Sequence, residues 1–111
     1  MLKRSQRLGA SEVSDVVRRG RAFHSEACML RVLRLGGATR ASGVAGVKVS
    51  KKASERNYQK RRVRNILIAA LGELEPGFGL VLVLKPAVKE YEFSRLREEV
   101  EGLLKGISRI Q

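Results

Sequence analysis

The sequence predicts an α+β fold in which helices pack on one small sheet. Apolar residues repeat at helical spacing in three segments, and the nearly uninterrupted apolar run at residues 78–84 is typical of a strand covered on both faces. The predicted elements follow the order α-β-β-α-β-α, which favours a sandwich of helices on a sheet. The 111 residues suit a single domain, residues 1–111, with one modest core.

The first predicted element is a short helix with one apolar stripe. Ser11 is a candidate N-cap, and Val13, Val16 and Val17 follow at helical spacing. Gly20 is the expected end of this helix.

Two strands are expected after the first helix. Residues 23–35 are rich in side chains that suit a strand, and residues 36–42, which begin with two glycines, indicate a turn or loop. Residues 43–49 alternate loosely and predict a second strand, weakened by Gly46.

The second and third helices carry the longest apolar stripes. In the second helix the stripe comprises Val63, Ile66, Leu67, Ala70, Leu71 and Leu74, and Pro76-Gly77 ends it. The strand at residues 78–84 follows and stops at Pro86. In the third helix one face comprises Phe93, Leu96, Val100, Leu103, Leu104 and Ile107, and the opposite, solvent-facing side comprises Arg95, Glu98, Glu99 and Glu101.

Positive charge is concentrated where the second helix begins. Residues 48–64 read KVSKKASERNYQKRRVR, and eight of these seventeen residues are Lys or Arg. The net charge of +12 is unevenly placed, because residues 1–64 hold 17 basic and 4 acidic side chains whereas residues 65–111 hold 6 and 7. The run continues into a helix whose apolar stripe must be buried in the core. It therefore predicts a folded surface that faces phosphates.

Helical spacing separates the charges of this run into faces. At about 100° per residue, Asn57, Lys60, Arg61 and Arg64 share one side of the helix, while Arg62 and Tyr58 lie on another. The amides of the first turn favour anions, and Lys51 and Lys52 precede that turn. Such a face suits a phosphate backbone and carries no base code by itself.

Residues for catalysis or metal binding are sparse. His24 is the only histidine and Asp15 the only aspartate, and no pair of acids stands out as a metal clamp. Cys28 lies among apolar residues and is interpreted as a small core side chain, and it has no second cysteine for a disulfide. The chain does not have the pattern of a self-sufficient enzyme.

The compartment is expected to be the cytoplasm. No apolar run is long enough to span a bilayer, and the basic residues 1–7 are not followed by the apolar stretch of a signal peptide. The lone cysteine is consistent with a reducing environment. No membrane partner is therefore expected.

The basic run resembles the signature of the protein subunit of bacterial ribonuclease P, which is Arg-Asn-Arg-x-Lys-Arg-x-x-Arg after a Ser-Lys-Lys loop. The matching residues are Arg56, Asn57, Lys60, Arg61 and Arg64, and the departure is Tyr58, where an arginine is usual. Ser50-Lys51-Lys52 is present a few residues closer to Arg56 than is common. Either a short deletion explains this, or Lys48 occupies the usual lysine site. The resemblance extends from Arg4 to about Ile107.

The resemblance implies a fold of the ribosomal protein S5 domain 2-like type, with a small mixed sheet and a left-handed β-α-β crossover, contrary to the usual handedness. It also implies that a catalytic RNA with Mg²⁺ removes the 5′ leader of precursor tRNA, while the protein, in a 1:1 complex, binds the RNA and the leader. By this match, the residues that contact RNA would be Lys48, Lys51, Lys52, Arg56, Asn57, Lys60, Arg61 and Arg64.

The resemblance also implies a leader-binding cleft between the first helix and the sheet. The family commonly has aromatic side chains there, whereas the matching positions here are Val13, Val17 and Cys28. Stacking on an aromatic contributes ~1–3 kcal/mol per base, so the leader is expected to be held more weakly or more by charge. Plain core packing is an equally good interpretation of Val13 and Val17.

Two other functions fit a basic α+β domain. One is a structural or ribosomal RNA-binding protein with no role in tRNA cleavage. The other is a DNA-binding regulator that places the second helix in a major groove, which is disfavoured because the basic face lacks the mixture of Gln, Asn and Ser that reads base edges.

Overall fold

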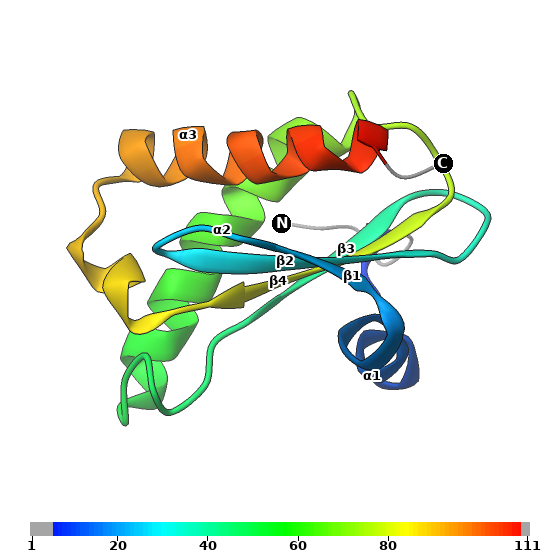
Figure 1. Cartoon of the computed structure of the whole chain (residues 1–111). Coiled ribbons are helices and arrows are strands. Elements are labelled where there is room, and N and C mark those ends of the chain that lie inside the picture. Colours follow the sequence, from blue (N-terminus) through cyan, green and yellow to red (C-terminus); the bar gives the residue numbers. More distant parts are fainter. Residues whose placement is uncertain (1–5, 110–111) are drawn as a thin grey trace.

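The computed structural model describes residues 6–109 as one four-stranded sheet between helices. The sheet order is β1-β2-β4-β3, with α2 and α3 on one face and α1 on the other (Figure 1). The elements are α1 (Ala10–Arg19), β1 (Arg21–His24), β2 (Cys28–Arg34), β3 (Arg40–Val44), α2 (Ala53–Leu71), β4 (Phe78–Leu84), η2 (Pro86–Glu90), α3 (Phe93–Leu104) and η3 (Lys105–Arg109). The α+β class is confirmed.

The segment expected as one strand at residues 23–35 is a β-hairpin. β1 pairs antiparallel with β2, and the turn between them is closed by Ser25 and Cys28. The Ser25 amide donates to the Cys28 carbonyl at 2.8 Å, and the Cys28 amide donates to Ser25 Oγ at 3.2 Å. The prediction of a single strand was wrong because one serine satisfies the turn locally, without Gly or Pro to signal it.

The strand expected at residues 43–49 lies earlier, at Arg40–Val44. It pairs in parallel with β4, with Ala41 opposite Leu80 and Val44 opposite Val83. Beyond Val44 the chain leaves the sheet, and Val49 is buried in the loop that follows. In residues 44–49, Val49 therefore anchors a loop to the core. The loose alternation of apolar residues in this segment led to the incorrect prediction of a strand.

The start of α1 also differs from the expectation. Gly9 occupies the N-cap in place of Ser11, and its amide donates to the Glu12 carboxylate at 3.0 Å. Arg40 of β3 donates to the same carboxylate at 3.0 Å. The Gly9 hydrogen bond and Arg40 lower the pKa of Glu12 below its ordinary value. The predicted end at Gly20 is confirmed.

The two faces of the sheet pack differently. On the α2 and α3 side, the alternate residues of β2 and β4 form the main core: Cys28, Leu30, Val32, Leu80, Leu82 and Leu84. On the other side, α1 approaches β4 closely at Gly79, where a Cβ atom would lie 2.4 Å from Leu35 Cδ1 and 3.1 Å from Val16 Cγ2. Glycine suits this position because a side chain would press on Leu35 and on Val16 of α1.

The apolar stripes of α2 and α3 are largely confirmed. Val63, Ile66, Leu67 and Leu71 of α2 are buried, as are Leu96, Val100, Leu103, Leu104 and Ile107 in and after α3. Phe93, expected in this stripe, is 43% exposed. Glu99, expected on the solvent side, instead accepts hydrogen bonds from the Ala27 amide at 3.1 Å and from Tyr91 Oη at 2.8 Å. Both predictions were wrong because ideal helical spacing does not show which neighbouring loops cover the flanks of a helix.

The strand–helix–strand unit is formed by β3, α2 and β4, and it joins two parallel neighbours in the sheet. This connection places the N-terminus of α2 beside the end of β3 and the loop at residues 45–52. Among the residues that the structure describes, no helix has the length and apolar character needed to cross a membrane.

Candidate nucleic-acid interface

The loop before α2 presents three lysines to solvent. Val49 is 1% exposed and fixes the loop to the core, while Lys48, Lys51 and Lys52 are exposed. Ser50 Oγ accepts a hydrogen bond from the Lys52 amide at 3.1 Å, which shapes the last turn before the helix. The local sequence therefore buries one valine and turns the lysines outward.

Arg56 holds this loop against the helix. Its guanidinium donates to the carbonyls of Ser50 and Lys51, both at 3.0 Å. Arg56 is half-buried, so part of its donor capacity is used inside the protein. The structure thus gives Arg56 a positioning role toward Lys51, beside the RNA contact that the resemblance implies.

The first turn of α2 adds partial positive charge. Lys52 is the N-cap and makes no side-chain capping hydrogen bond, so the amides of the first turn have no side-chain acceptor at the cap. The one acid of this turn, Glu55, accepts a hydrogen bond from Gln59 Nε2 at 3.1 Å. The dipole and the neighbouring lysines act together to favour an anion at this end.

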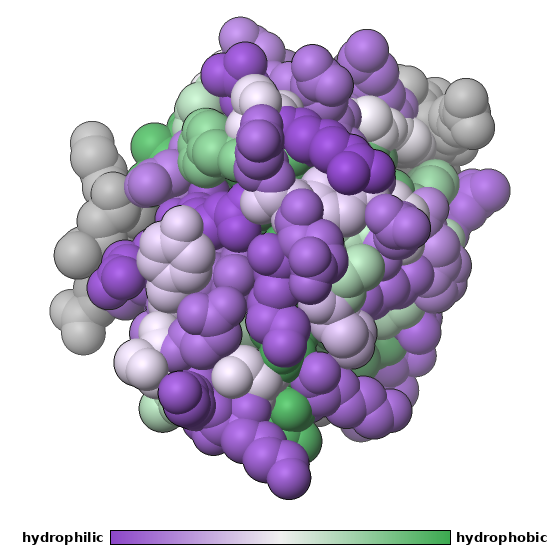
Figure 2. Space-filling model, turned by 90° about the vertical axis from the view of Figure 1, so that its left-hand side faces the viewer, coloured by the Kyte–Doolittle hydropathy of each residue, from purple (hydrophilic) through white to green (hydrophobic). Residues whose placement is uncertain are grey.

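The predicted basic face of α2 is formed by Asn57, Lys60, Arg61 and Arg64. Asn57 and Arg61 are exposed, and Lys60 and Arg64 are half-buried. Within residues 6–109, none of these side chains is bonded to a carboxylate. The end of the molecule around the start of α2 is predominantly hydrophilic (Figure 2). An extended surface of fixed, unneutralised cations is suited to a polyanion.

Arg62 lies on another side of α2, as predicted. It is 9% exposed, donates to Gln59 Oε1 at 2.8 Å and also donates to the Tyr91 carbonyl. Its guanidinium carbon lies 5.7 Å from the centroid of the Tyr58 ring, which is itself 48% exposed. Arg62 therefore serves the packing of α2, and the basic run contains cations with two different functions.

The implied leader-binding surface is only partly brought together. Val13 is half-buried and Val17 is 37% exposed on α1, on the side of the sheet opposite α2 and α3. Cys28 is fully buried among the core residues on the α2 and α3 side, so it cannot line a cleft beside α1. The assignment of Cys28 to that cleft was wrong because its side chain is buried on the other face of the sheet.

Met29 occupies the position on the α1 side that Cys28 was expected to fill. It is half-buried and lies opposite Val83 of β4 and His24 of β1. The strand alternation could have identified Met29, because successive side chains point to opposite faces. That inference required the start of β2 at Cys28, which the sequence did not mark.

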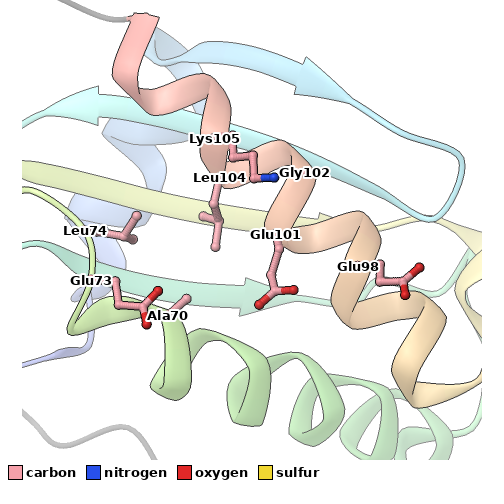
Figure 3. A pocket seen from close by; sticks show the side chains of 8 residues that line it. All are labelled: Ala70, Glu73, Leu74, Glu98, Glu101, Gly102, Leu104 and Lys105. Atoms are coloured by element: carbon pink, nitrogen blue, oxygen red, sulfur yellow. The ribbon is translucent and has the colours of Figure 1, made fainter.

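One cavity lies far along α2 from the basic face. Its volume is about 490 Å³, and it lies between the C-terminal end of α2 and α3 (Figure 3). Leu74 and Leu104 form apolar walls, and Glu73, Glu98 and Glu101 contribute carboxylates. These charges repel phosphate, so this cavity is not part of a nucleic-acid interface.

Within residues 6–109, neither a metal-binding cluster nor a thiol with a lowered pKa is found. In the part of the chain that the structure describes, no three His, Cys, Asp or Glu residues lie close enough together to hold a metal ion. Burial, and secondarily the charge of Glu99, raises the pKa of the Cys28 thiol to about 12. A thiol with that pKa is protonated at neutral pH and is a poor nucleophile.

Comparison with known proteins decides the family. The family model described as Ribonuclease P matches residues 2–108. The chain belongs to the ribonuclease P protein family. Its resemblance to that family, inferred from the basic run, is confirmed.

Relatives and a solved structure of the ribonuclease P family agree with this assignment. The ribonuclease P protein component of a Picosynechococcus species is 30% identical over 94 residues, which cover 84% of this chain and 81% of that protein. The component of a Cyanothece species is 42% identical over 57 residues, covering 51% of this chain and 44% of that protein. The ribonuclease P protein of Thermotoga maritima superposes with a TM-score of 0.80 at 28% identity, over 95% of this chain and 97% of that one. Mirror-image connections do not superpose, so the β3–α2–β4 crossover has the same hand in both.

Proposed function

We propose that this chain is the protein subunit of a ribonuclease P and binds the catalytic RNA of that enzyme through the loop at residues 48–52 and the basic face of α2. The observation that carries the proposal is the set of unneutralised cations on α2, in a chain that belongs to the ribonuclease P family. Fixed charges at helical spacing contact successive phosphates and orient an RNA without reading its sequence.

The chemistry of cleavage is assigned to the RNA partner. Residues 6–109 contain no cluster of three metal-binding side chains that could hold Mg²⁺. In this proposal the residues of the protein subunit bind and position RNA and take no catalytic step. The metal ions that activate water would be held by RNA phosphates in the complex.

The second ligand of the protein is the 5′ leader of precursor tRNA. We assign it to the surface formed by Val13, Val17 and Met29, beside the exposed part of the sheet. Without an aromatic platform, the protein holds the leader by apolar contact and charge, which is weaker than stacking. One protein binds one catalytic RNA, and the complex acts in the cytoplasm.

A binding experiment separates this function from that of a structural RNA-binding protein. The complex of protein and catalytic RNA is titrated with precursor tRNA and with mature tRNA in Ca²⁺ in place of Mg²⁺, and gel analysis checks that the precursor stays uncleaved. The proposal requires tighter binding of the precursor when protein is present and no such difference with the RNA alone. Equal binding of both tRNAs would favour a purely structural RNA-binding role.

A further inference from the structure

A groove with apolar walls lies between the C-terminal end of α2 and α3, on the side of the sheet that these two helices cover (Figure 3). It consists of the cavity of about 490 Å³ described above and an adjoining cavity of about 310 Å³, and Leu74 and Leu104 line both. Ala70 of α2 adds apolar surface to the first cavity, and Ile107 of η3 adds it to the second. Cavities of roughly 300–1,000 Å³ are the usual size of binding sites in proteins.

Carboxylates surround this groove, although the chain as a whole carries a net charge of +12. Glu73, Glu98 and Glu101 line the first cavity, and Glu75 lines the second. Within residues 6–109 none of these four acids forms an ion pair. Lys105 is the one basic residue that lines either cavity. The groove is therefore a negatively charged site on a positively charged molecule, and it favours a cationic occupant.

Gly102 leaves this groove open, although nothing in the fold requires a glycine there. It lies in the last turn of α3 without a positive φ, and a Cβ atom at this position would have no neighbour within 4 Å. Gly106 differs, because a Cβ atom there would lie 2.9 Å from the ring of Phe23. Glycine is less favourable than alanine in a helix, so Gly102 lowers helix stability and its visible effect is an unfilled stretch of groove.

We propose that this groove binds a segment of a partner protein in which apolar side chains are flanked by lysine or arginine. The apolar walls receive the apolar side chains, as in other complexes of a helix with a groove, and the surrounding carboxylates pair with the flanking cations. α2 has 19 residues and is about 28 Å long, so the loop at residues 48–52 lies at the far end of this helix from the groove. A partner bound here leaves that loop free for RNA, and the proposal therefore goes beyond the proposed function.

The first test uses the full protein without RNA and a synthetic helical peptide with leucines three and four residues apart and lysines beside them. Fluorescence anisotropy should show saturable binding of this leucine–lysine peptide, and the amide NMR signals of Leu74 and Leu104 should shift. Two control peptides, one with serine in place of leucine and one with glutamate in place of lysine, should each bind about tenfold more weakly. Absence of saturable binding, or equal binding of the serine peptide, would overturn the proposal.

The second test changes the groove itself. Gly102→Leu should fill it and weaken binding of the leucine–lysine peptide about tenfold or more, whereas Ser94→Leu adds the same side chain to an exposed part of α3 outside the groove and should not. Glu98→Gln combined with Glu101→Gln should weaken binding about fivefold. Glu90→Gln, which removes an exposed acid outside the groove, should leave it unchanged. Thermal unfolding checks the fold of each variant, and equal binding by the groove variants and their controls would overturn the proposal.

A second copy of this chain is the other occupant that the experiments distinguish. Sedimentation of the protein without RNA or peptide should show a monomer at the concentrations used for peptide binding. Self-association that Gly102→Leu abolishes and Ser94→Leu preserves would show that the groove binds another copy of the chain. That result would overturn the assignment of the groove to a partner protein.

Discussion

The buried guanidinium of Arg62 donates a hydrogen bond to the backbone carbonyl of Tyr91, and this contact joins α2 to the segment that enters α3. Arg62 also donates to Gln59, which in turn donates to Glu55. The most basic stretch of the sequence therefore contains a buried arginine whose hydrogen bonds join two elements of the protein. The neighbouring Arg61 is exposed, and among residues 6–109 its guanidinium has no hydrogen-bond partner.

Arg62→Ala should lower the free energy of unfolding by about 2–4 kcal/mol, because it leaves buried acceptors of Gln59 and Tyr91 unsatisfied. Chemical denaturation measures this loss. Arg61→Ala, one residue earlier on the exposed face, should leave the free energy of unfolding within about 0.5 kcal/mol of the parent. Similar stabilities of the two variants would contradict the packing role of Arg62.

Arg61→Ala combined with Arg64→Ala should weaken binding to the catalytic RNA and flatten its salt dependence by about 0.7–0.9 per lost phosphate contact. The measurement is the slope of the logarithm of the binding constant against the logarithm of the salt concentration. Arg62→Ala, studied at a temperature where the variant is folded, should lose much less affinity for the catalytic RNA. Equal losses from Arg61 and Arg62 would show that the charges act diffusely rather than as one face.

Val17→Phe should increase the preference of the complex for precursor tRNA over mature tRNA, since Val17 is 37% exposed on α1 and an aromatic ring there can stack on an unpaired base. Val13→Phe should act in the same direction, and the binding ratio of the two tRNAs is the readout. Thermal unfolding confirms that each variant is folded.

Cys28→Phe is the contrasting variant for this surface. Because Cys28 is fully buried on the opposite face, the added volume should cost about 1–3 kcal/mol of stability and leave the tRNA preference unchanged. An increased preference for precursor tRNA in Cys28→Phe, without a loss of stability, would reverse the assignment of the two sheet faces.

Cys28 also makes the stability depend on alkaline pH. Burial raises the pKa of the folded thiol to about 12 from an ordinary value of 9.0. The unfolded chain therefore loses this proton first, and the stabilising contribution is complete below pH 9 and is lost as pH rises toward 12. The slope approaches about 1.4 kcal/mol per pH unit in this window.

The pH effect is measured by comparing the parent with Cys28→Ala in denaturant melts at several alkaline pH values. The difference in unfolding free energy between the two should narrow as pH rises, because other titrating groups are shared. A constant difference across the window would mean that the folded thiol ionises as readily as the unfolded one.

An element could be predicted from the sequence when the apolar pattern that identifies it lies entirely within its own residues. The apolar stripe of α2 and the continuous run of β4 depend on the residues of one segment, and both are confirmed. The β1–β2 turn depends instead on a single side chain, Ser25, and it was missed in the sequence. The phase of β2, that is, which of its residues point to each face of the sheet, was therefore also missed. That phase decides whether Cys28 or Met29 faces α1.

The same distinction applies to the candidate nucleic-acid interface: the features that depend on one helix could be predicted, and those that depend on contacts between segments could not. Helical spacing separated Arg61 from Arg62, because the angle between them is a property of the helix. The bridge between Arg7 and Ala41 could not be predicted, since it depends on the pairing of the N-terminal segment with β3 across a long stretch of chain. Likewise, the hydrogen bonds of Arg56 to the loop carbonyls require the loop conformation.

The most direct test of the proposed function is reconstituted cleavage of precursor tRNA at low Mg²⁺. Under these conditions the catalytic RNA alone should be nearly inactive and the protein alone should be inactive, whereas the two together should release the 5′ leader. At limiting protein, the double variant Arg61→Ala, Arg64→Ala should restore less activity than the parent protein. Failure of the folded protein to stimulate the RNA, or cleavage by the protein without RNA, would contradict the account.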